Sequence, residues 1–202
     1  MLSREEETNM KTLFAVVCAA LVCAWSPAWS QTGGKIVLAG SSDGSTCSIV
    51  ESGPAVVAVH VVVLDVVGLS GIQFAAPKPD CWTDATWSYE EVPVPVFIGN
   101  TQDPVQGLSV AFGDCLDAPV HVATIYFFSL GNGAPCCSYP VVKATGDLHP
   151  EIDGPIVVMC SDPMNVAGVP VDVVINPDQS CPCLSPVSAE ETTWGGVKAL
   201  YH

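Results

Sequence analysis

Basic residues are scarce in this sequence. It contains 6 Lys and Arg against 21 Asp and Glu, so the 202-residue chain has a formal net charge of -15. Binding to the phosphates of nucleic acid, or to an anionic membrane surface, needs a basic face on the protein. The composition therefore excludes nucleic acid as a partner, and it favours solubility and the attraction of cations instead.

Common signatures of catalytic and metal sites are also missing. The chain has no H-E-x-x-H motif, and Cys181-Pro182-Cys183 has one residue between its cysteines where zinc and redox pairs have two or more. Glycosidases need two facing carboxylates, and the spacing of acids in a sequence does not show which of them face each other. We therefore expect no catalytic residues and a non-enzymatic protein. The alternative is a secreted hydrolase that acts on carbohydrate through a carboxylate pair.

The one long uncharged apolar run lies near the N-terminus, at Thr12–Ala24, and is shorter than the about 20 residues that span a bilayer. Met10-Lys11 precedes it, and Ala28-Trp29-Ser30 follows with small residues where signal peptidase requires them. The pattern predicts a signal peptide over residues 1–30, with Met10 as the expected start and no transmembrane anchor after cleavage. We expect a secreted, cell-surface or periplasmic protein; a retained N-terminal anchor helix is the alternative.

Eight cysteines follow the leader, and an exported chain holds such an even set as disulfides. They are Cys47, Cys81, Cys115, Cys136, Cys137, Cys160, Cys181 and Cys183. Cys136 and Cys137 are adjacent, so in an extended strand they point to opposite sides and need two different partners. We expect Cys160 to bond one of these two, and Cys81 to bond Cys115.

Short Val-rich segments alternate with clusters of Gly, Pro, Asp and Asn, which is typical of an all-β protein. No segment before residue 190 shows the apolar period of about 3.6 residues that an α/β fold would need. The predicted strands are Lys35–Ala39, Ser45–Val50, Ala55–Asp65, Gly71–Ala75, Val92–Ile98, Leu108–Phe112, Val120–Leu130, Ser138–Lys143, Ile156–Cys160 and Val171–Ile175. Their spacing predicts an antiparallel, immunoglobulin-like β-sandwich over residues 31–176, stapled by disulfides.

Residues 177–202 differ from the rest of the chain. A Cys/Pro-rich linker is followed by a short amphipathic tail, in which Trp194, Leu200 and Tyr201 would share one face of a short helix. We expect this tail either to dock on the domain or to contact a partner.

The two longest predicted strands, Ala55–Asp65 and Val120–Leu130, are apolar on both faces. A sandwich strand normally has one buried and one wet face, so an apolar second face needs a cover or a partner. Strict alternation assigns His60, Val62 and Leu64 to that face of the first strand, and Ile125 and Phe127 to that face of the second. These residues are our predicted partner contacts, and the expected partner is a protein or glycan at the cell surface.

Each of three further groups of residues allows two interpretations. His60 and His121 would meet and bind a metal if their strands were neighbours; otherwise they are two half-exposed strand residues. The loop with Asp147, Glu151 and Asp153 offers oxygens to Ca²⁺, which would make the protein a calcium-dependent extracellular binding domain, or it is simply solvated. The aromatic residues near Cys81 form a platform for sugar or peptide, or they pack on a disulfide; they are Trp82, Trp87 and Tyr89.

The segment VVVLDVVGLSGIQFAAP, which begins at Val61, resembles cohesin-like sandwiches, as does APVHVATIYFFSL, which begins at Ala118. This resemblance implies a cohesin-like β-sandwich. Cohesins bind dockerin modules in cell-surface assemblies, but they lack the eight cysteines of this chain, so dockerin binding does not carry over.

The chain also resembles uncharacterised secreted proteins of environmental bacteria. The resemblance rests on the segment from Gln73 to Cys81, on Ile98-Gly99-Asn100-Thr101-Gln102, on the Cys136-Cys137 pair and on the ending TTWGxxKALY. It implies a secreted module with a structural, adhesive or ligand-binding role and no assigned activity.

Overall fold

The computed structural model describes residues 33–147, 149–161 and 165–183. In these ranges every regular element is a strand, which confirms the all-β prediction: β1 (Lys35–Ala39), β2 (Ser48–Ile49), β3 (Ala55–Leu64), β4 (Leu69–Phe74), β5 (Ala85–Glu91), β6 (Val96–Gly99), β7 (Leu108–Leu116), β8 (Val120–Ser129), β9 (Cys137–Tyr139), β10 (Ile156–Met159), β11 (Asn165–Ala167), β12 (Val169–Val171) and β13 (Val173–Ile175). The predicted signal peptide and amphipathic tail lie outside the described residues. Nothing helical in the described part of the chain is long and apolar enough to cross a bilayer.

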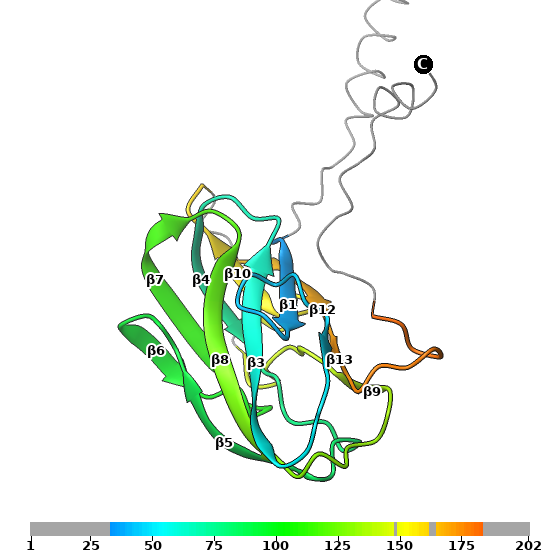
Figure 1. The fold of residues 1–202 in the computed structure, drawn as a ribbon. Coiled ribbons are helices and arrows are strands. Elements are labelled where there is room, and N and C mark those ends of the chain that lie inside the picture. Colours follow the sequence, from blue (N-terminus) through cyan, green and yellow to red (C-terminus); the bar gives the residue numbers. More distant parts are fainter. Residues whose placement is uncertain (1–32, 148, 162–164, 184–202) are drawn as a thin grey trace, which may run out of the picture. The chain divides into compact units, whose positions relative to one another are not determined.

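The strands form two five-stranded sheets and one three-stranded sheet (Figure 1). The first sheet has the order β12-β1-β3-β8-β5, the second β11-β10-β4-β7-β6, and the third β2-β13-β9. Neighbouring strands run antiparallel except for two pairs, β1 with β12 and β2 with β13. The architecture is therefore the predicted antiparallel β-sandwich with a small additional sheet.

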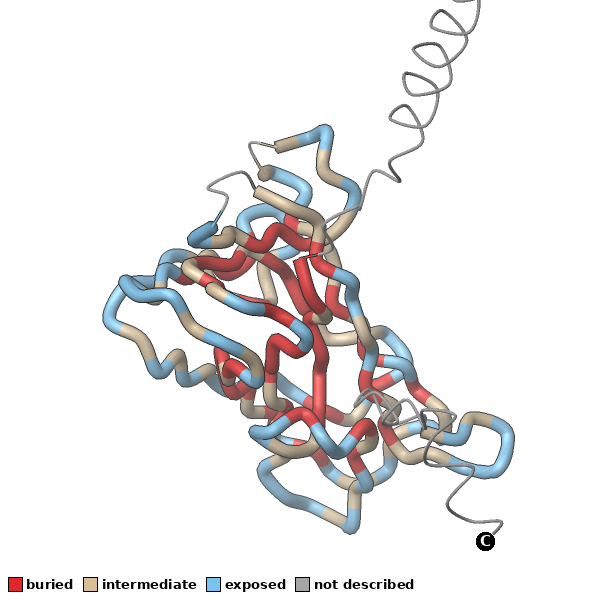
Figure 2. The backbone as a smooth tube through the Cα atoms, turned by 90° about the horizontal axis from the view of Figure 1, so that it is seen from above, coloured by how far each residue is buried: buried red, intermediate tan, exposed pale blue. Residues whose placement is uncertain are grey.

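One hydrophobic core lies between the inner faces of the sheets. Buried residues gather in the interior of the described domain, and exposed residues lie around them (Figure 2). Val59 and Val61 of β3 belong to this core together with Ile72 and Phe74 of β4. Side chains from outside the two large sheets join them. Trp82 packs on Phe127 at a ring-centroid distance of 4.7 Å, and Phe127 packs on Tyr139 of β9 at 5.8 Å. The third sheet therefore shares the core of the other two.

A β-bulge in β8 decides which side chains face outward. The register of β3 with β8 shifts between Val61 and Val62, and the consecutive residues Val122 and Ala123 are both buried in the core. A bulge adds one residue to a strand and so breaks the strict alternation of faces. His121, before the bulge, therefore lies on the same face as Thr124, which follows it.

This bulge corrects two of the predicted partner contacts. Ile125 and Phe127 are fully buried in the core, because the extra residue turns them inward rather than onto the second face. Val62 and Leu64 do lie on the second face, but they are also buried, in a small cluster with Val37 and Ala39 of β1. Val62, Leu64, Ile125 and Phe127 are therefore buried rather than partner contacts. Among the predicted strand residues, only His60 is half-exposed.

The edge strands differ from the prediction. Residues 92–98 were predicted as a strand; the strand that forms there is β6, which begins at Val96, after Pro93 and Pro95, and is the edge of the second sheet. Proline has no N–H for a strand ladder, so the ladder starts where the prolines end. The pattern does not predict β5, because its sequence, ATWSYEE, is polar and aromatic rather than Val-rich.

All eight cysteines are paired, as Cys47–Cys183, Cys81–Cys137, Cys115–Cys160 and Cys136–Cys181. The expectation that Cys136 and Cys137 have different partners is confirmed. The expected pairings of Cys81 with Cys115, and of Cys160 with Cys136 or Cys137, are wrong.

Strand order explains the Cys115–Cys160 disulfide, one of the pairs that the sequence did not predict. Leu69 at the start of β4 pairs with Leu116 of β7 on one side and with Met159 of β10 on the other. The ends of β7 and β10 therefore flank the same residue, and Cys115 and Cys160 lie 6.0 Å apart between their Cα atoms. Sequence spacing does not show this relation because β4 lies between the two strands.

Candidate functional site

The outward face of the first sheet is built from side chains that pair in rows across β3, β8 and β5. The strand register places Val56 opposite Phe128, which in turn lies opposite Thr86. The next row is Ala58, Tyr126 and Tyr89, and the row after it is His60, Thr124 and Glu91. The face thus changes along the strands from apolar and aromatic to polar and titratable.

We call Val56, Tyr89, Tyr126 and Phe128 the aromatic strip. Val56 is 63% exposed, Tyr89 49% and Phe128 46%, although all three are large hydrophobic side chains. The rings of Tyr89 and Tyr126 stack at a centroid distance of 4.5 Å with an interplanar angle of 22°. Stacking and the sheet backbone hold the strip rigid, so little side-chain entropy is lost when it contacts another surface.

A carboxylate borders the strip. The hydroxyl of Tyr126 donates a hydrogen bond to Oε2 of Glu91 at 3.0 Å. This hydrogen bond and the negative charge of Glu91 raise the pKa of Tyr126. The hydroxyl therefore stays protonated at neutral pH, and the strip ends in a polar, acidic rim.

His60 and His121 meet on the same face. Nδ1 of His60 lies 3.3 Å from Nε2 of His121, and their ring centroids are 5.4 Å apart. Oγ1 of Thr124 lies 3.1 Å from the His60 nitrogen and 3.0 Å from the His121 nitrogen. The strands are neighbours, so the condition set by the sequence analysis for a meeting of the two rings is fulfilled.

Both imidazoles are held neutral. Burial lowers the pKa of His60, the nearby His121 lowers it further, and Asp43 acts in the opposite direction. Burial also lowers the pKa of His121, against a backbone hydrogen bond at Ala123 that raises it. At neutral pH the pair therefore carries no charge and keeps nitrogen lone pairs.

The loop between β1 and β2 lies next to this pair. Ser41 and Ser45 donate hydrogen bonds to Oδ1 of Asp43 at 2.6 and 2.7 Å, and these bonds lower the pKa of Asp43 to about 2. Residues 40–44, GSSDG, also fit the G-x-S-x-G pattern of serine hydrolases. That pattern is catalytic where it joins a strand to a helix, whereas this loop joins two strands, and the hydroxyls that bind Asp43 are those of Ser41 and Ser45 rather than of Ser42, the serine of the pattern.

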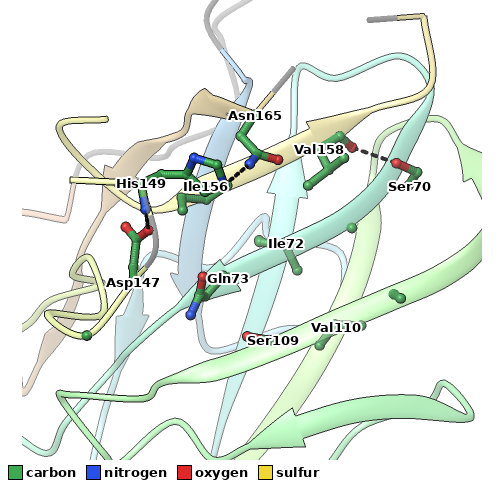
Figure 3. Close-up of a pocket in the computed structure, with 13 residues that line it drawn as sticks. Ser70, Ile72, Gln73, Ser109, Val110, Asp147, His149, Ile156, Val158 and Asn165 are labelled. Atoms are coloured by element: carbon green, nitrogen blue, oxygen red, sulfur yellow. Dashed lines mark hydrogen bonds between the residues drawn. The ribbon is translucent and has the colours of Figure 1, made fainter. Parts of the chain in front are cut away.

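The outward face of the second sheet has a groove of about 440 Å³ (Figure 3). Its floor is made of small or short side chains of β4 and β7, among them Gly71, Ser109 and Ala111. His149 and Asn165 stand at its wall, with His149 Nε2 2.6 Å from Asn165 Nδ2. The other ring nitrogen of His149 lies 3.1 Å from a carboxylate oxygen of Glu151, so this histidine is already tied to two neighbours.

The calcium prediction fails at this loop. The ammonium of Lys143 lies 3.0 Å from Oδ2 of Asp147 and donates hydrogen bonds to the carbonyl oxygens of His149 and Ile152. Carboxylate and carbonyl oxygens of this kind are what Ca²⁺ would need. A lysine of the chain already supplies the positive charge, and Glu151 and Asp153 are exposed, so the predicted ligand set Asp147, Glu151 and Asp153 does not converge on a cation site.

Glu51 forms a polar cluster where the third sheet meets β8. Its carboxylate accepts hydrogen bonds from Trp82 Nε1 at 2.7 Å, Asn176 Nδ2 at 2.8 Å, Gly133 N at 3.1 Å and the hydroxyl of Ser129. Burial alone would raise the pKa of Glu51, but these hydrogen bonds outweigh burial and lower it. Every carboxylate oxygen is thus engaged in holding loops together. Trp82 is fully buried, and among the aromatic residues near Cys81 only Trp87 and Tyr89 are exposed.

One further cluster has metal-ligand composition. Cys136, Asp178 and Cys181 bring their ligand atoms within 4.8 Å of one another. Cys136 and Cys181 are bonded to each other, however, so neither offers a thiolate. The cluster is a disulfide next to a carboxylate.

The structure thus brings together a site that differs from the predicted one. His60 is on the exposed face as expected, while Trp194, Leu200 and Tyr201 lie outside the described residues. Tyr126 and Phe128 were missed because strict alternation assigned them to the inner face. The sequence carries no signal that would have found them, because this strand is apolar on both faces and the pair Val122-Ala123 does not stand out within it.

No family model and no curated protein matches this chain. Among solved structures, the chain is similar to one from a crystal structure described as a novel type I cohesin–dockerin complex from Clostridium thermocellum. The identity is 12%, the match covers 70% of this chain and 97% of that chain, and the TM-score is 0.42. A likeness at this level carries no conclusion about activity or partners.

Proposed function

We propose that this chain is exported and acts outside the cytoplasm as a non-enzymatic binding module, which contacts a protein partner through the aromatic strip. The observation that carries the proposal is the exposure of Val56, Tyr89 and Phe128 on one rigid sheet face. Contiguous exposed apolar side chains with a polar rim are typical of protein contact sites.

The form of the strip favours a protein over a glycan or small molecule. Sites for small ligands are concave, whereas the strip lies on rows of paired strands and contributes nothing to the groove of the second sheet. Its composition, with Val56 and Phe128 beside two tyrosines, is that of an interface centre, where aromatic residues are enriched and charges are depleted.

Charge narrows the kind of partner. Glu91 borders the strip, Asp43 lies near the histidine pair, and the chain has a net charge of -15. Complementary potentials speed the encounter and disfavour wrong partners. The partner surface that fits is therefore an apolar patch bordered by Lys and Arg.

Export is supported by the disulfides and by the predicted leader. Disulfides persist in oxidising compartments, and four of them tie together the loops of this domain. Two of these reach Cys181 and Cys183, so the described part of the Cys/Pro-rich segment is attached to the sandwich rather than free of it. A position at the cell surface is part of the proposal.

The alternatives receive less support. A carbohydrate hydrolase needs two facing carboxylates in a cleft. Among the residues that line the groove, Asp147 is the single acid, and it is paired with Lys143. The calcium-dependent module lacks its site, since Lys143 occupies the loop that was predicted to hold the ion.

The test compares the two outward faces in the full chain, produced with its disulfides. One variant carries Val56→Ser and Phe128→Ser in the strip, and the control carries Val96→Ser and Ile98→Ser on β6, whose side chains are comparably exposed. Each protein is used to capture partners from the source culture. The captured protein is then purified, and its affinity for each variant is measured by calorimetry.

We expect the strip variant to bind the purified partner at least about tenfold more weakly, and the control to bind as the unaltered chain does. Both variants should keep their unfolding free energy within about 0.5 kcal/mol, because all four side chains are on the surface. Equal binding by the strip variant would overturn the proposal. Loss of binding only in a chain that lacks residues 190–202 would assign the contact to the tail, and strip-dependent binding to polysaccharide alone would assign it to a glycan.

A further inference from the structure

We propose that His60, His121 and Thr124 form a binding site for a divalent transition-metal ion of the Zn²⁺ class. The site is separate from the aromatic strip, although both lie on the outward face of the first sheet. It does not depend on the proposed partner.

The distances among the three side chains match a metal site. Zn–N bonds of about 2.0–2.1 Å in tetrahedral geometry place two ligand nitrogens about 3.3–3.4 Å apart. The nitrogens of His60 and His121 are 3.3 Å apart, and Thr124 Oγ1 is 3.1 and 3.0 Å from them. The two nitrogens therefore already span one edge of a coordination tetrahedron, water fills the other positions, and the Thr124 hydroxyl lies beside them to hydrogen-bond a metal-bound water.

The sheet backbone holds these side chains in place. His60 and Thr124 are paired in the register of β3 with β8, two central strands of the first sheet. The bulge at Val122 brings His121 onto their face, which strict alternation would not do. Because the ligands come from central strands rather than from loops, little conformational entropy is lost when an ion binds.

The electrostatic setting also suits a cation. Metal ligation by histidine needs a ring nitrogen with a free lone pair, and His60 Nδ1 and His121 Nε2 face each other at 3.3 Å. Two acidic residues border the site: Asp43 from the loop between β1 and β2, whose charge acts on His60, and Glu91, which pairs with Thr124 in the register of β5 with β8. Imidazole selects Zn²⁺, Ni²⁺ and Cu²⁺ over Mg²⁺ and Ca²⁺, which prefer oxygen.

The test is a titration of the full chain with Zn²⁺ alone in metal-free buffer, followed by calorimetry. The variants are His60→Asn, His121→Asn and Thr124→Val. The control is His149→Gln combined with His202→Gln, because His149 lies on the other sheet and His202 lies outside the described residues. We expect one ion per chain, a loss of affinity of at least about tenfold for either strand-histidine variant, a smaller loss for Thr124→Val, and no change in the control.

A second measurement on the unaltered chain covers the case in which a variant does not fold. The imidazole proton resonances of all four histidines are followed by NMR while Zn²⁺ is added, with Mg²⁺ as the control ion. We expect Zn²⁺ to shift the resonances of His60 and His121 selectively, and Mg²⁺ to leave them unchanged. Shifts confined to His149 or His202, or no shift at all, would overturn the site. The strip variant should bind Zn²⁺ as the unaltered chain does. The metal site and the partner contact can therefore each be disproved without affecting the other.

Discussion

The two outward faces of the sandwich differ in what their strands project into solvent. The first sheet projects aromatic rings and a histidine pair, while the second projects glycine, serine and alanine along β4 and β7. Large side chains in paired rows make an exposed apolar surface, and small ones make a groove that is bordered by His149 from a loop and by Asn165 of β11 (Figure 3). The comparison shows that the outward residues, rather than the shared architecture, determine what each face can bind.

Polar contacts also differ between the two faces. On the second sheet, Lys143 satisfies a nearly buried carboxylate and two carbonyl oxygens, so its role is to fix the loop. On the first sheet, His60, His121 and Thr124 hydrogen-bond to one another; both rings are half-exposed, and Thr124 is buried. The first arrangement neutralises a buried charge, whereas the second joins uncharged side chains, two of which are half-exposed.

The largest expected effect comes from deleting Val122, which removes the bulge that separates the two kinds of face. Without the extra residue, either His121 turns into the core or Ile125 and Phe127 turn toward solvent. We expect the free energy of unfolding to fall by more than about 4 kcal/mol, or the fold to be lost. Urea denaturation followed by circular dichroism measures this.

The control for this deletion is Val122→Ala, which keeps the bulge and removes two methyl groups from the core. Val122→Ala should lower the free energy of unfolding by about 2 kcal/mol, which is less than the deletion does. Equal stability of the deletion and the unaltered chain would contradict the assignment of the faces.

A smaller loss of unfolding free energy is expected for Lys143→Met. This variant tests whether Lys143 holds the loop beside the second sheet in place. The change leaves the Asp147 carboxylate, whose side chain is 1% exposed, without its cation. Removing one partner of a buried pair costs about 3 kcal/mol. The matched control is Lys35→Met, because Lys35 pairs with Asp65 at 2.7 Å in an exposed setting.

The control should cost less than about 1 kcal/mol, since exposed ion pairs add little. Both values come from chemical denaturation at neutral pH. A result in which the two lysine variants lose the same stability would show that the loop on the second face is not fixed by Lys143.

The smallest expected effect concerns Glu51, which lies on neither outward face but ties β8 to the third sheet. Its pKa is lowered in the folded chain, so its contribution to stability is present above the unfolded pKa of about 4.3 and is lost as pH falls through the lower folded value. Glu51→Gln should cost about 1–2 kcal/mol at neutral pH, because it replaces an acceptor by a donor next to Trp82 and Asn176.

The measurement is the midpoint of thermal unfolding at several pH values from 3 to 7. The unaltered chain should lose stability below about pH 4.5, and the variant should show a shallower slope in that range. Parallel curves for the two proteins would mean that Glu51 does not contribute to the acid sensitivity.

Much of the fold was predictable because local patterns carry it. Val-rich segments bounded by turn residues correctly located strands such as β3, β8 and β10, since burial requires apolar side chains there. The separate partners of Cys136 and Cys137 were predicted correctly, although the extended strand assumed for both begins only at Cys137, and Cys136 has a φ of 61°. The candidate site was less predictable: His60 was placed correctly, but Tyr126 and Phe128 were assigned inward and Ile125 and Phe127 outward.

By itself, the sequence determined that the chain is all-β, acidic and rich in cysteines, because composition and short-range periodicity depend on residues near one another in the chain. The tertiary structure alone decided which cysteines pair, which side chains of β8 point outward, and that the ammonium group of Lys143 lies in the loop near Asp147. Each of these depends on strand order and on a single inserted residue, and a one-residue shift exchanges the two faces of a strand. Local pattern does not contain that register, since it is set by contacts between segments far apart in the chain.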